Sequence, residues 1–380
     1  MNLMSWLDEA LAPAGLRLFR ARPRTSGQVA MELLDADGRL CAGLWESDAA
    51  MTRRIASELV ERAGGDLVEL LGGGHLLVQR EGVDRYLPSL EVVVRQPGAR
   101  LVAHRAEQRA VVRIDCRRYV TVVRSGRTGP TVAPLTQLTR ADVRLPRVLE
   151  VDDDRGVVIL SAVPGRTLFD CLSDPTSDDR RLAREVGRLG LALRSFHSQV
   201  PSVACLVQDR GAEAAAARRW LEAASRHGIL EDRSWRPLLD RVCTGIAERP
   251  AVRAVVHRDL HDKQVLLQPD EPVGLVDLDR VGYGDPALDL ANLLVHLDLR
   301  ALEGVCTPER AALCAAALLE GYSPDRQLSD RLMGYAGLRR LRLAGVYSFR
   351  RAPAGLVDRM LGQMHAGPKK WLWQSWGDER

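Results

Sequence analysis

The sequence predicts an α+β protein with a small antiparallel sheet lobe, a mainly helical lobe after it and an α+β cap before both. Three short β-rich runs follow one another at 101–104, 110–115 and 118–124, as in an antiparallel sheet. From residue 176 onward, apolar residues recur at the spacing of amphipathic helices. A polar loop between short apolar runs, at 254–279, interrupts these helices. We expect the cap at 1–97, the sheet lobe at 98–162 and the helical lobe, with the interrupting hairpin, at 163–380.

Composition and charge exclude several classes of protein. The formal net charge of +4 over 380 residues argues against a dedicated nucleic-acid-binding protein, which concentrates basic residues on one face. No apolar run approaches the roughly 18 residues that span a bilayer, so we expect no membrane contact. The seven cysteines are scattered and include no C-x-x-C pair, which is typical of reduced thiols. With acidic residues rather than a basic segment at its start, the chain is expected to be cytoplasmic.

The cap combines helical and strand patterns. An amphipathic helix is expected at 3–11, and a second helix, capped by Ser47 or Asp48, runs through 51–63. Alternating or apolar runs predict strands at 16–20, 29–34, 39–45, 67–71 and 75–78. The triplet Gly72-Gly73-Gly74 lacks the Lys-Ser/Thr of a phosphate-binding P-loop, so we interpret it as a turn.

The remaining elements follow the same rules. A short helix at 134–142 and a strand pair at 145–149 and 156–160 complete the sheet lobe. Helices are predicted at 176–196, 212–226, 235–247, 288–299, 308–319 and 328–348. The last of these is dense in arginine, including Arg331, Arg339, Arg340 and Arg342, and we interpret that charge run as a solvated face.

The segment 254–279, which interrupts the helices, contains the candidate catalytic residues. Asp259 and Gln264 lie on the polar loop between two short strands, and Asp277 follows the next strand. The segment 268–272 is rich in turn formers, which suits a hairpin that brings Asp277 back beside Asp259. Phosphoryl transfer needs one carboxylate to hold the attacking hydroxyl, and a second carboxylate with a neutral oxygen to hold a metal. This loop and hairpin can supply all three groups.

The motifs of this stretch resemble those of the aminoglycoside phosphotransferase/choline kinase superfamily, small-molecule relatives of the protein kinases. The order H-R-D-L-H-D-K-Q, D-L-D and then G-D-P-A-L-D-L-A at 284–291 is similar to that family's H-x-D-x-x-x-x-N, hydrophobic-D-hydrophobic-[DE] and G-D-P-x-x-D-[LI]-A. The resemblance implies a bilobal protein-kinase-like fold and transfer of a phosphate from ATP, with Mg²⁺, to a hydroxyl. It implies that Asp259 is the base and that Gln264 and Asp277 hold the metal. Gln264 stands where the family has asparagine.

The sheet lobe departs from that family. Relatives often carry R-Y-V-x-K-V in the third strand, whereas the segment 119–124 has no lysine; the chain's lysines are Lys263, Lys369 and Lys370. One interpretation is that Arg113 or Arg124 replaces the missing lysine, since guanidinium binds phosphate well. The other is a degenerate kinase that holds nucleotide weakly or not at all. The resemblance also places the hinge between lobes at 161–165, where the backbone at Ser161 and Val163 would hold the adenine.

The sequence defines the molecule that accepts the phosphate less closely than it defines the reaction. The resemblance implies a hydroxyl of a small molecule such as a sugar, an aminoglycoside or an amino alcohol. Two alternatives stay open: a catalytically impaired module that binds a partner for regulation, and a kinase for Ser/Thr of a peptide natural-product precursor. Either alternative would involve a protein or peptide partner.

Overall fold

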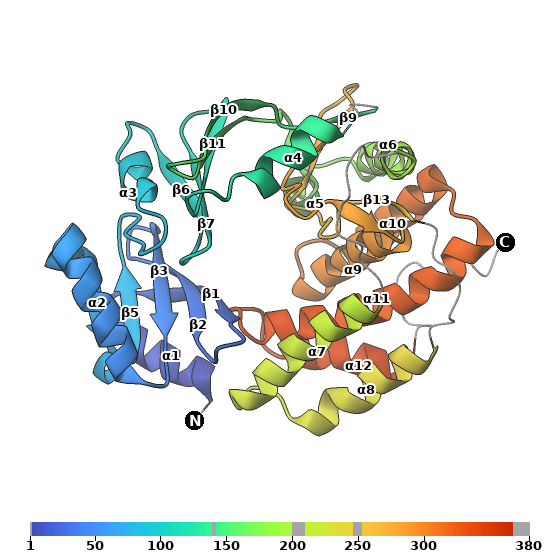
Figure 1. The fold of residues 1–380 in the computed structure, drawn as a ribbon. Helices are drawn as coiled ribbons and strands as arrows, with labels where there is room; N and C mark the ends of the chain where they lie inside the picture. Colours follow the sequence, from blue (N-terminus) through green and yellow to red (C-terminus); the bar gives the residue numbers. More distant parts are fainter. Residues whose placement is uncertain (1, 139–141, 200–209, 246–252, 368–380) are drawn as a thin grey trace.

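The computed structural model describes residues 2–138, 142–199, 210–245 and 253–367. Figure 1 shows the cap with its sheet, a second sheet next to it, and the helices that make up most of the second half of the chain. Among the described residues, no helix combines the length and the apolar character that a membrane crossing requires.

The cap is a five-stranded sheet flanked by two helices. Its antiparallel strands, in the order β1-β2-β3-β5-β4, are β1 (Arg17–Pro23), β2 (Val29–Leu34), β3 (Leu40–Trp45), β5 (Leu76–Gln79) and β4 (Val68–Leu71). Helix α1 (Leu3–Leu11) buries Leu3, Leu7 and Leu11, spaced one helical turn apart. Helix α2 (Ala49–Ala63) begins after Asp48, whose side chain accepts a hydrogen bond from the backbone N–H of Ala50. Residues 72–74 form a short turn, as predicted.

The sheet lobe is a second antiparallel five-stranded sheet. Its order is β10 (Val148–Asp152), β11 (Val157–Ser161), β8 (Arg118–Val123), β7 (Arg109–Arg113) and β6 (Arg100–Arg105). Buried residues of β7 and β8 pack against Leu87 and Leu90, the latter in helix α3 (Ser89–Val94). Helix α4 (Gly129–Gln137) begins five residues before the predicted 134, because Pro130 is compatible with a first helical turn. Residues 139–141 of the predicted helix lie outside the described residues.

The helical lobe is built around α9 (Ala287–Glu303), which is buried on nearly all sides. Around it lie α5 (Leu168–Ser173), α6 (Asp179–His197), α7 (Arg210–Arg226), α8 (Asp232–Gly245), α10 (Pro308–Tyr322), α11 (Arg326–Tyr347) and α12 (Leu356–His365). Helices α6 and α10 approach so closely that a Cβ on Gly190 would lie 2.4 Å from the backbone oxygen of Leu318. Helices α6 to α11 match the predicted ones, although residues 246–247 of the predicted helix at 235–247 lie outside the described residues; α5 and α12 were not predicted.

The arginines of α11 correct the interpretation of a solvated face. Arg331, Arg339 and Arg340 are 6%, 2% and 1% exposed. Helix α11 contacts α7, α8, α9 and α12, so little of its surface reaches solvent. Arg331 forms an ion pair with Asp285 at 2.5 Å, and Arg340 forms one with Asp298. These buried charges are therefore paired with carboxylates instead of being hydrated.

Two small sheets lie on either side of the polar loop 257–264 in the sequence. Strand β14 (Val265–Leu267) pairs antiparallel with β15 (Val273–Leu275), which confirms the predicted hairpin; β12 (Arg166–Thr167) and β9 (Val143–Arg144) extend this sheet. Strand β13 (Ala254–Val256) pairs instead with β16 (Gly282–Gly284). The polar loop 257–264 therefore connects two different sheets.

The cap touches both lobes. On the helical side, the backbone N–H of Ala21 donates to the carbonyl of Phe349 at 2.8 Å, and that of Leu3 donates to the carbonyl of His227 at 3.2 Å. On the sheet side, Arg24 forms an ion pair with Glu107 at 2.6 Å. The cap therefore bridges the two lobes on one side of the molecule, to the left in Figure 1.

Candidate active site

A buried carboxylate holds the start of the polar loop. Asp289, in the first turn of α9, accepts hydrogen bonds from the backbone N–H groups of His257 (2.6 Å) and Arg258 (2.8 Å). The Nε2 of His257 donates to the carbonyl of Val276 at 3.0 Å, which ties the loop to the end of the hairpin. Arg258 has a φ of +70°, a left-handed conformation that is uncommon for a residue other than glycine. The chain thus makes a tightly held turn directly before Asp259.

Asp259 is flanked by positive charge. Guanidinium nitrogens of Arg339 and Arg342 lie 3.9 and 4.0 Å from its Oδ1, close enough for electrostatic attraction and too far for hydrogen bonds. Burial acts to raise the pKa of Asp259, but the charges of Arg342, His261, Arg339 and Arg280 outweigh it, so the pKa lies well below its ordinary value. The side chain is 24% exposed, so the charged carboxylate can be reached by a hydroxyl group.

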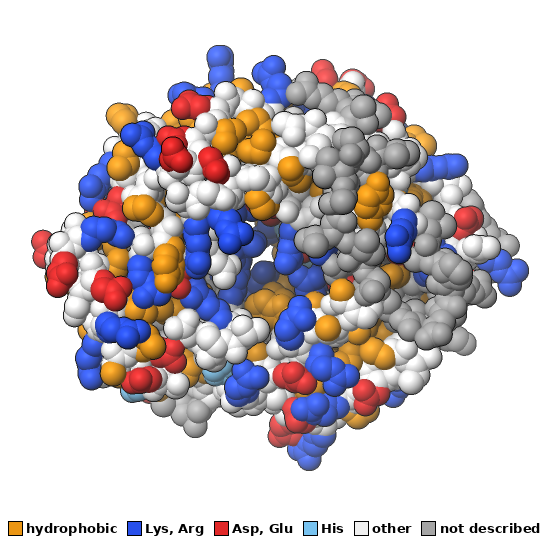
Figure 2. Space-filling model, in the orientation of Figure 1, with side chains coloured by type: hydrophobic (Ala, Val, Ile, Leu, Met, Phe, Trp, Pro, Cys, Tyr) orange, Lys and Arg blue, Asp and Glu red, His pale blue; other side chains and the backbone are white. Residues whose placement is uncertain are grey.

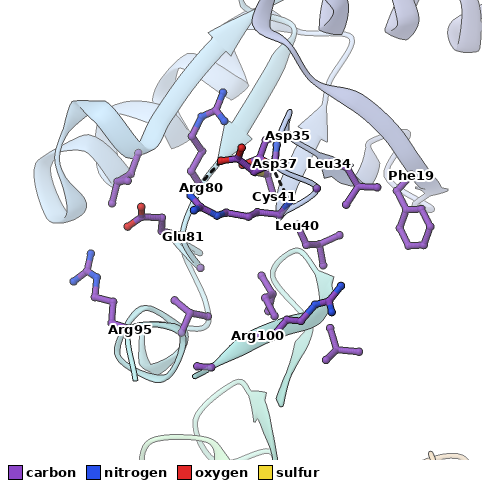
Figure 3. Close-up of a pocket in the computed structure, with 18 of the residues that line it drawn as sticks. Phe19, Leu34, Asp35, Asp37, Leu40, Cys41, Arg80, Glu81, Arg95 and Arg100 are labelled. Carbon is purple, nitrogen blue, oxygen red and sulfur yellow. Dashed lines mark hydrogen bonds and ion pairs between the residues drawn. The ribbon is translucent and has the colours of Figure 1, made fainter. Parts of the chain in front are cut away.

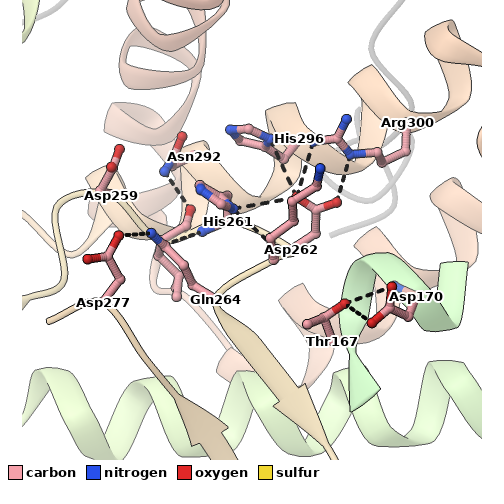
Figure 4. Close-up of polar contacts among 12 residues, drawn as sticks. Thr167, Asp170, Asp259, His261, Asp262, Gln264, Asp277, Asn292, His296 and Arg300 are labelled. Atoms are coloured by element: carbon pink, nitrogen blue, oxygen red, sulfur yellow. Dashed lines mark hydrogen bonds and ion pairs between the residues drawn. The ribbon is translucent and has the colours of Figure 1, made fainter. Parts of the chain in front are cut away.

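Gln264 and Asp277 lie together at the base of the hairpin. The amide Nε2 of Gln264 donates to Oδ2 of Asp277 at 3.1 Å, and its Oε1 accepts from the backbone N–H of His261 at 3.3 Å. Figure 4 shows Asp259 and Asp277 beside the Gln264 side chain. Burial raises the pKa of Asp277, yet the net shift is downward because of Arg109, while the charge of Asp259 opposes that lowering. The two carboxylates are thus within electrostatic reach of each other.

Arg109 connects the sheet lobe to this cluster. Its Nη1 lies 2.8 Å from Oδ1 of Asp277 and 2.6 Å from Oδ2 of Asp279. Arg109 is the first residue of β7 and directly follows the loop 106–108. Burial raises the pKa of Asp279 despite this guanidinium. A single cation from the sheet lobe is therefore shared by the two carboxylates that follow β15.

The loop 106–108 is fixed by the cap. Glu107 is buried, has a φ of +62°, and forms ion pairs with Arg24 at 2.6 Å and Arg85 at 3.2 Å. Its backbone N–H donates to the buried carboxylate of Asp84 at 2.6 Å. Arg124, one of the predicted phosphate ligands, donates its Nε to the carbonyl of Glu107 at 2.7 Å, and its guanidinium lies 4.2 Å from the centre of the Tyr86 ring. Arg124 therefore braces the loop.

Arg113 lies elsewhere. It ends β7, at the opposite end of that strand from Arg109, and lines a cavity of about 1380 Å³ between the cap and the sheet lobe. Figure 3 shows this cavity, with Arg80 and Glu81 of the cap on one side and Arg100 of β6 on the other. The structure thus does not bring Arg113 to the cluster of Asp259, Gln264 and Asp277.

The predicted hinge is anchored to the hairpin. Ser161 ends β11; its backbone N–H donates to the carbonyl of Arg147, and its Oγ accepts from the backbone N–H of Arg147, both at 2.9 Å. The Val163 side chain packs so closely on β15 that a Cβ on Gly274 would lie 2.5 Å from it. These contacts fix the position of the backbone at 161–163 relative to the hairpin that carries Asp277.

Sequence reasoning missed the three arginines that surround the carboxylates, Arg109, Arg339 and Arg342. One available signal was the position of Arg109 immediately after a glycine-free loop in a lobe without lysine. For Arg339 and Arg342, the signal was an arginine run with no acidic residue between 331 and 357 to pair with it. If such a run is buried, its positive charges must be paired with carboxylates from other parts of the fold.

The comparisons with known proteins agree with this geometry. A sheet lobe, a helical lobe and a carboxylate-bearing hairpin define a protein-kinase-like phosphotransferase. The model of the phosphotransferase enzyme family matches residues 98–335, well over half of the chain, so the chain belongs to that family. The predicted resemblance, the predicted fold class and the prediction of a phosphotransferase with an alcohol group as acceptor are confirmed.

Several solved structures are similar to this chain. Aminoglycoside phosphotransferase APH(3'')-Id from Streptomyces rimosus is 23% identical, with a match that covers 67% of this chain and 96% of that one and a TM-score of 0.49. Aminoglycoside-3'-phosphotransferase of type VIII is 24% identical over 68% of this chain and 99% of that one, with a TM-score of 0.48. A choline/ethanolamine kinase family protein from Mesorhizobium loti is 16% identical over 73% and 93%, with a TM-score of 0.46. A search of curated proteins found no match.

Proposed function

We propose that this protein transfers the γ-phosphate of ATP, with Mg²⁺, to a hydroxyl group of a small molecule. The observation that carries the proposal is the grouping of Asp259, Gln264 and Asp277 at one end of the hairpin. In the reaction, the acceptor oxygen bonds to the γ-phosphorus while the bond from that phosphorus to the bridging oxygen breaks, and ADP leaves with that electron pair. The proton of the hydroxyl passes to Asp259 and then to water.

The donor set of Asp277 and Gln264 fits Mg²⁺. Carboxylate and amide oxygens are the ligands this cation prefers, and Asp277 is charged because its pKa is lowered. In this structure the amide nitrogen of Gln264 faces Asp277 and its oxygen accepts from the backbone N–H of His261, so holding the cation would require the amide to turn and give up that hydrogen bond. When bound, the cation would neutralise negative charge on the phosphates. Asp279 is linked to Asp277 by Arg109, whose guanidinium group contacts both carboxylates.

We assign the phosphate contact of the missing lysine to Arg109 rather than to Arg113 or Arg124. Arg109 starts the strand that follows the loop 106–108, and its guanidinium already reaches the hairpin. Arg113 lines a different cavity and Arg124 is bound to the loop. When nucleotide binds, the guanidinium of Arg109 would turn from the carboxylates to a phosphate oxygen, which it can hold in a two-pronged contact.

A second candidate function is a kinase-like module without catalysis. The ion pairs of Arg109 with Asp277 and Asp279 favour it, because a guanidinium on both carboxylates competes with a metal ion for the same oxygens. Asp259 argues against this second function. Its carboxylate is charged and reachable, and the guanidinium groups that pair with it among the described residues, those of Arg339 and Arg342, lie beyond hydrogen-bond distance. Nucleotide binding and turnover separate the two candidates.

The test is ATP binding with Mg²⁺ and then turnover. We expect ATP with Mg²⁺ to raise the melting temperature of the wild type, and Asp277→Asn and Arg109→Gln to reduce that rise. Arg113→Gln is the matched control from the same strand and should bind ATP as the wild type does. Asp259→Asn should bind ATP normally but lower phosphate transfer by about 10²–10⁴-fold. If ATP binds neither the wild type nor these variants, the proposal is wrong.

A further inference from the structure

Positive charge gathers where the three parts of the molecule meet. Figure 2 shows that the face seen in Figure 1 is hollowed at its centre and that lysine and arginine side chains surround the hollow. Strands β1 and β7 and helices α9 and α11 lie around the same place in Figure 1. This concentration contrasts with the nearly balanced charge of the chain as a whole.

On the side of Asp259, arginines outnumber carboxylates among the described residues. Arg339 and Arg342 of α11 share two carboxylates, Asp259 at 3.9 and 4.0 Å and Glu213 at 3.7 and 3.5 Å. Arg339 also donates to the backbone carbonyl of Arg258 at 3.2 Å. Arg280, which is exposed, adds a third guanidinium group that acts on Asp259. In this wall around Asp259, three guanidinium groups therefore act on two carboxylates.

A separate set of arginines acts on Asp277 and Asp279, where the phosphate donor ATP would bind. Arg109 contacts Asp277 and Asp279 directly, and Arg105, just before the loop 106–108, acts on the same two carboxylates. Neither arginine is among the leading charges that act on Asp259. Because the phosphates of ATP would be met by Arg105 and Arg109, the arginines around Asp259 are not needed for the nucleotide.

Strand β1 of the cap carries further positive charge. Arg20 and Arg22 of β1 share the buried Glu32, at 2.5 and 4.0 Å. Burial and the nearby charges of Arg105, Arg20 and Arg350 lower the pKa of Arg22 to about 9. Arg20 and Arg350 also lower the pKa of Lys263 in the polar loop 257–264, so their charge reaches this loop.

From this arrangement we propose that the acceptor is a small hydroxyl compound that carries a carboxylate or phosphate group, held by Arg342, Arg339 and Arg280 next to Asp259. The inference rests on the proposed function, because it assumes that the hydroxyl is presented to Asp259. A guanidinium group binds carboxylate and phosphate oxygens with paired hydrogen bonds, so these side chains can orient such an acceptor. A cationic acceptor, such as an amino sugar, would be repelled by the same wall.

The experiment compares acceptors that differ only in charge. Each of two scaffolds is titrated calorimetrically into the full-length protein with ADP and Mg²⁺ present. The hexose set is glucose, glucosamine, glucuronate and glucose 6-phosphate; the three-carbon set is glycerol, serinol, glycerate and glycerol 3-phosphate. We expect an acidic member to bind at least about ten-fold more tightly than its neutral and cationic partners, with an affinity that falls as salt is added.

Two variants decide whether the wall around Asp259 is responsible. Arg342→Gln should weaken binding of the acidic probe about ten-fold, and Arg326→Gln, an exposed arginine at the start of the same helix, should leave it unchanged. Binding of no acidic probe, tighter binding of a cationic probe, or equal binding by Arg342→Gln and the wild type would overturn the proposal.

An ATP titration in the same buffer separates this inference from the proposed function. If ATP binds and the amino compounds are preferred, the proposed function stands and the inference fails. If the acidic probes bind in an Arg342-dependent manner but ATP does not, the anion site stands and the proposed function fails.

Discussion

At the scale of single residues, the candidate site depends on how charge is compensated in partly buried surroundings. Asp259 and Asp277 both keep pKa values below their ordinary range although burial acts to raise them. Different arginines cause this in the two cases, those of α11 for Asp259 and Arg109 of β7 for Asp277. Each carboxylate thus remains charged at neutral pH because a second element supplies a cation.

A buried histidine below the loop responds to pH in a way that can be measured. His296 of α9 stacks near His261, with ring centres 4.9 Å apart, and its Nδ1 lies 3.3 Å from an Nη of Arg300. Burial lowers the pKa of His296 well below 6.5, and the charges of its neighbours add to the effect. Below pH 6.5 the unfolded chain therefore binds a proton at this position that the folded protein does not.

We predict that the free energy of unfolding falls as the pH is lowered from 7.5 to 5.5. His296 contributes a slope of up to about 1.4 kcal/mol per pH unit below 6.5. In His296→Gln, which keeps an acceptor for Arg300, urea denaturation at several pH values should show a smaller fall. A steeper fall in the variant than in the wild type would contradict the lowered pKa.

At the scale of elements, the loop 106–108 replaces glycine flexibility with fixed ion pairs. Relatives are expected to close a glycine-rich loop over the phosphates, whereas here Glu107 is bound by two arginines that lie outside the sheet lobe's strands. Asp84, which also accepts from the backbone N–H of Glu107, contacts His104 at 2.9 Å. The loop is therefore held in place before any ligand binds, and its position depends on the cap.

Removing the charge of Glu107 should release this loop. Glu107→Gln leaves Arg24 and Arg85 without their shared carboxylate, so we expect a loss of about 3–5 kcal/mol in the free energy of unfolding, as for other broken buried ion pairs. Chemical denaturation measures the loss. Glu58→Gln, which removes an exposed carboxylate 3.7 Å from Arg85, is the matched control and should change stability by less than about 1 kcal/mol. Equal effects of the two substitutions would show that Glu107 does not fix the loop.

At the scale of the whole molecule, the cap joins the two lobes that form the site. Its core includes Leu7 and Leu18 of the cap together with Ala224 of α7 and Phe349 after α11, so it is continuous with the helical lobe. Its other contacts fix the loop of the sheet lobe. A single body thus sets the distance between the loop 106–108 and the arginines around Asp259.

Weakening the cap at Phe349 should loosen both lobes. Phe349 is fully buried, and Phe349→Ala should cost about 3–5 kcal/mol through the lost contacts and the cavity left behind. Hydrogen exchange of β1 should speed up in this variant, since Ala21 donates to the carbonyl of Phe349. Phe19→Ala, at a side chain that is 41% exposed, should leave this exchange nearly unchanged. Unchanged exchange in Phe349→Ala would mean that the cap is held by other contacts.

Most of the secondary structure could be predicted, and two errors have clear causes. The start of α4 was predicted at Pro134, whereas the helix begins at Gly129, because Pro130 is tolerated in a first helical turn. The arginines of α11 were assigned to solvent because their carboxylate partners, such as Asp285 and Asp298, lie far away in the sequence. The spacing of residues along a helix does not show which distant residues will contact them.

The sequence by itself determined the order of the candidate site: Asp259, Gln264 and Asp277 on a loop and hairpin, followed by the helix that carries Asp289 in its first turn. These residues lie within one short stretch, where turn formers and strand lengths decide the geometry. Only the tertiary structure decided which cations meet them. Arg109 reaches Asp277 across 168 positions of sequence, and Arg339 reaches Asp259 from helix α11. Such pairs form because buried charges must be compensated by whatever the packing of distant elements brings near.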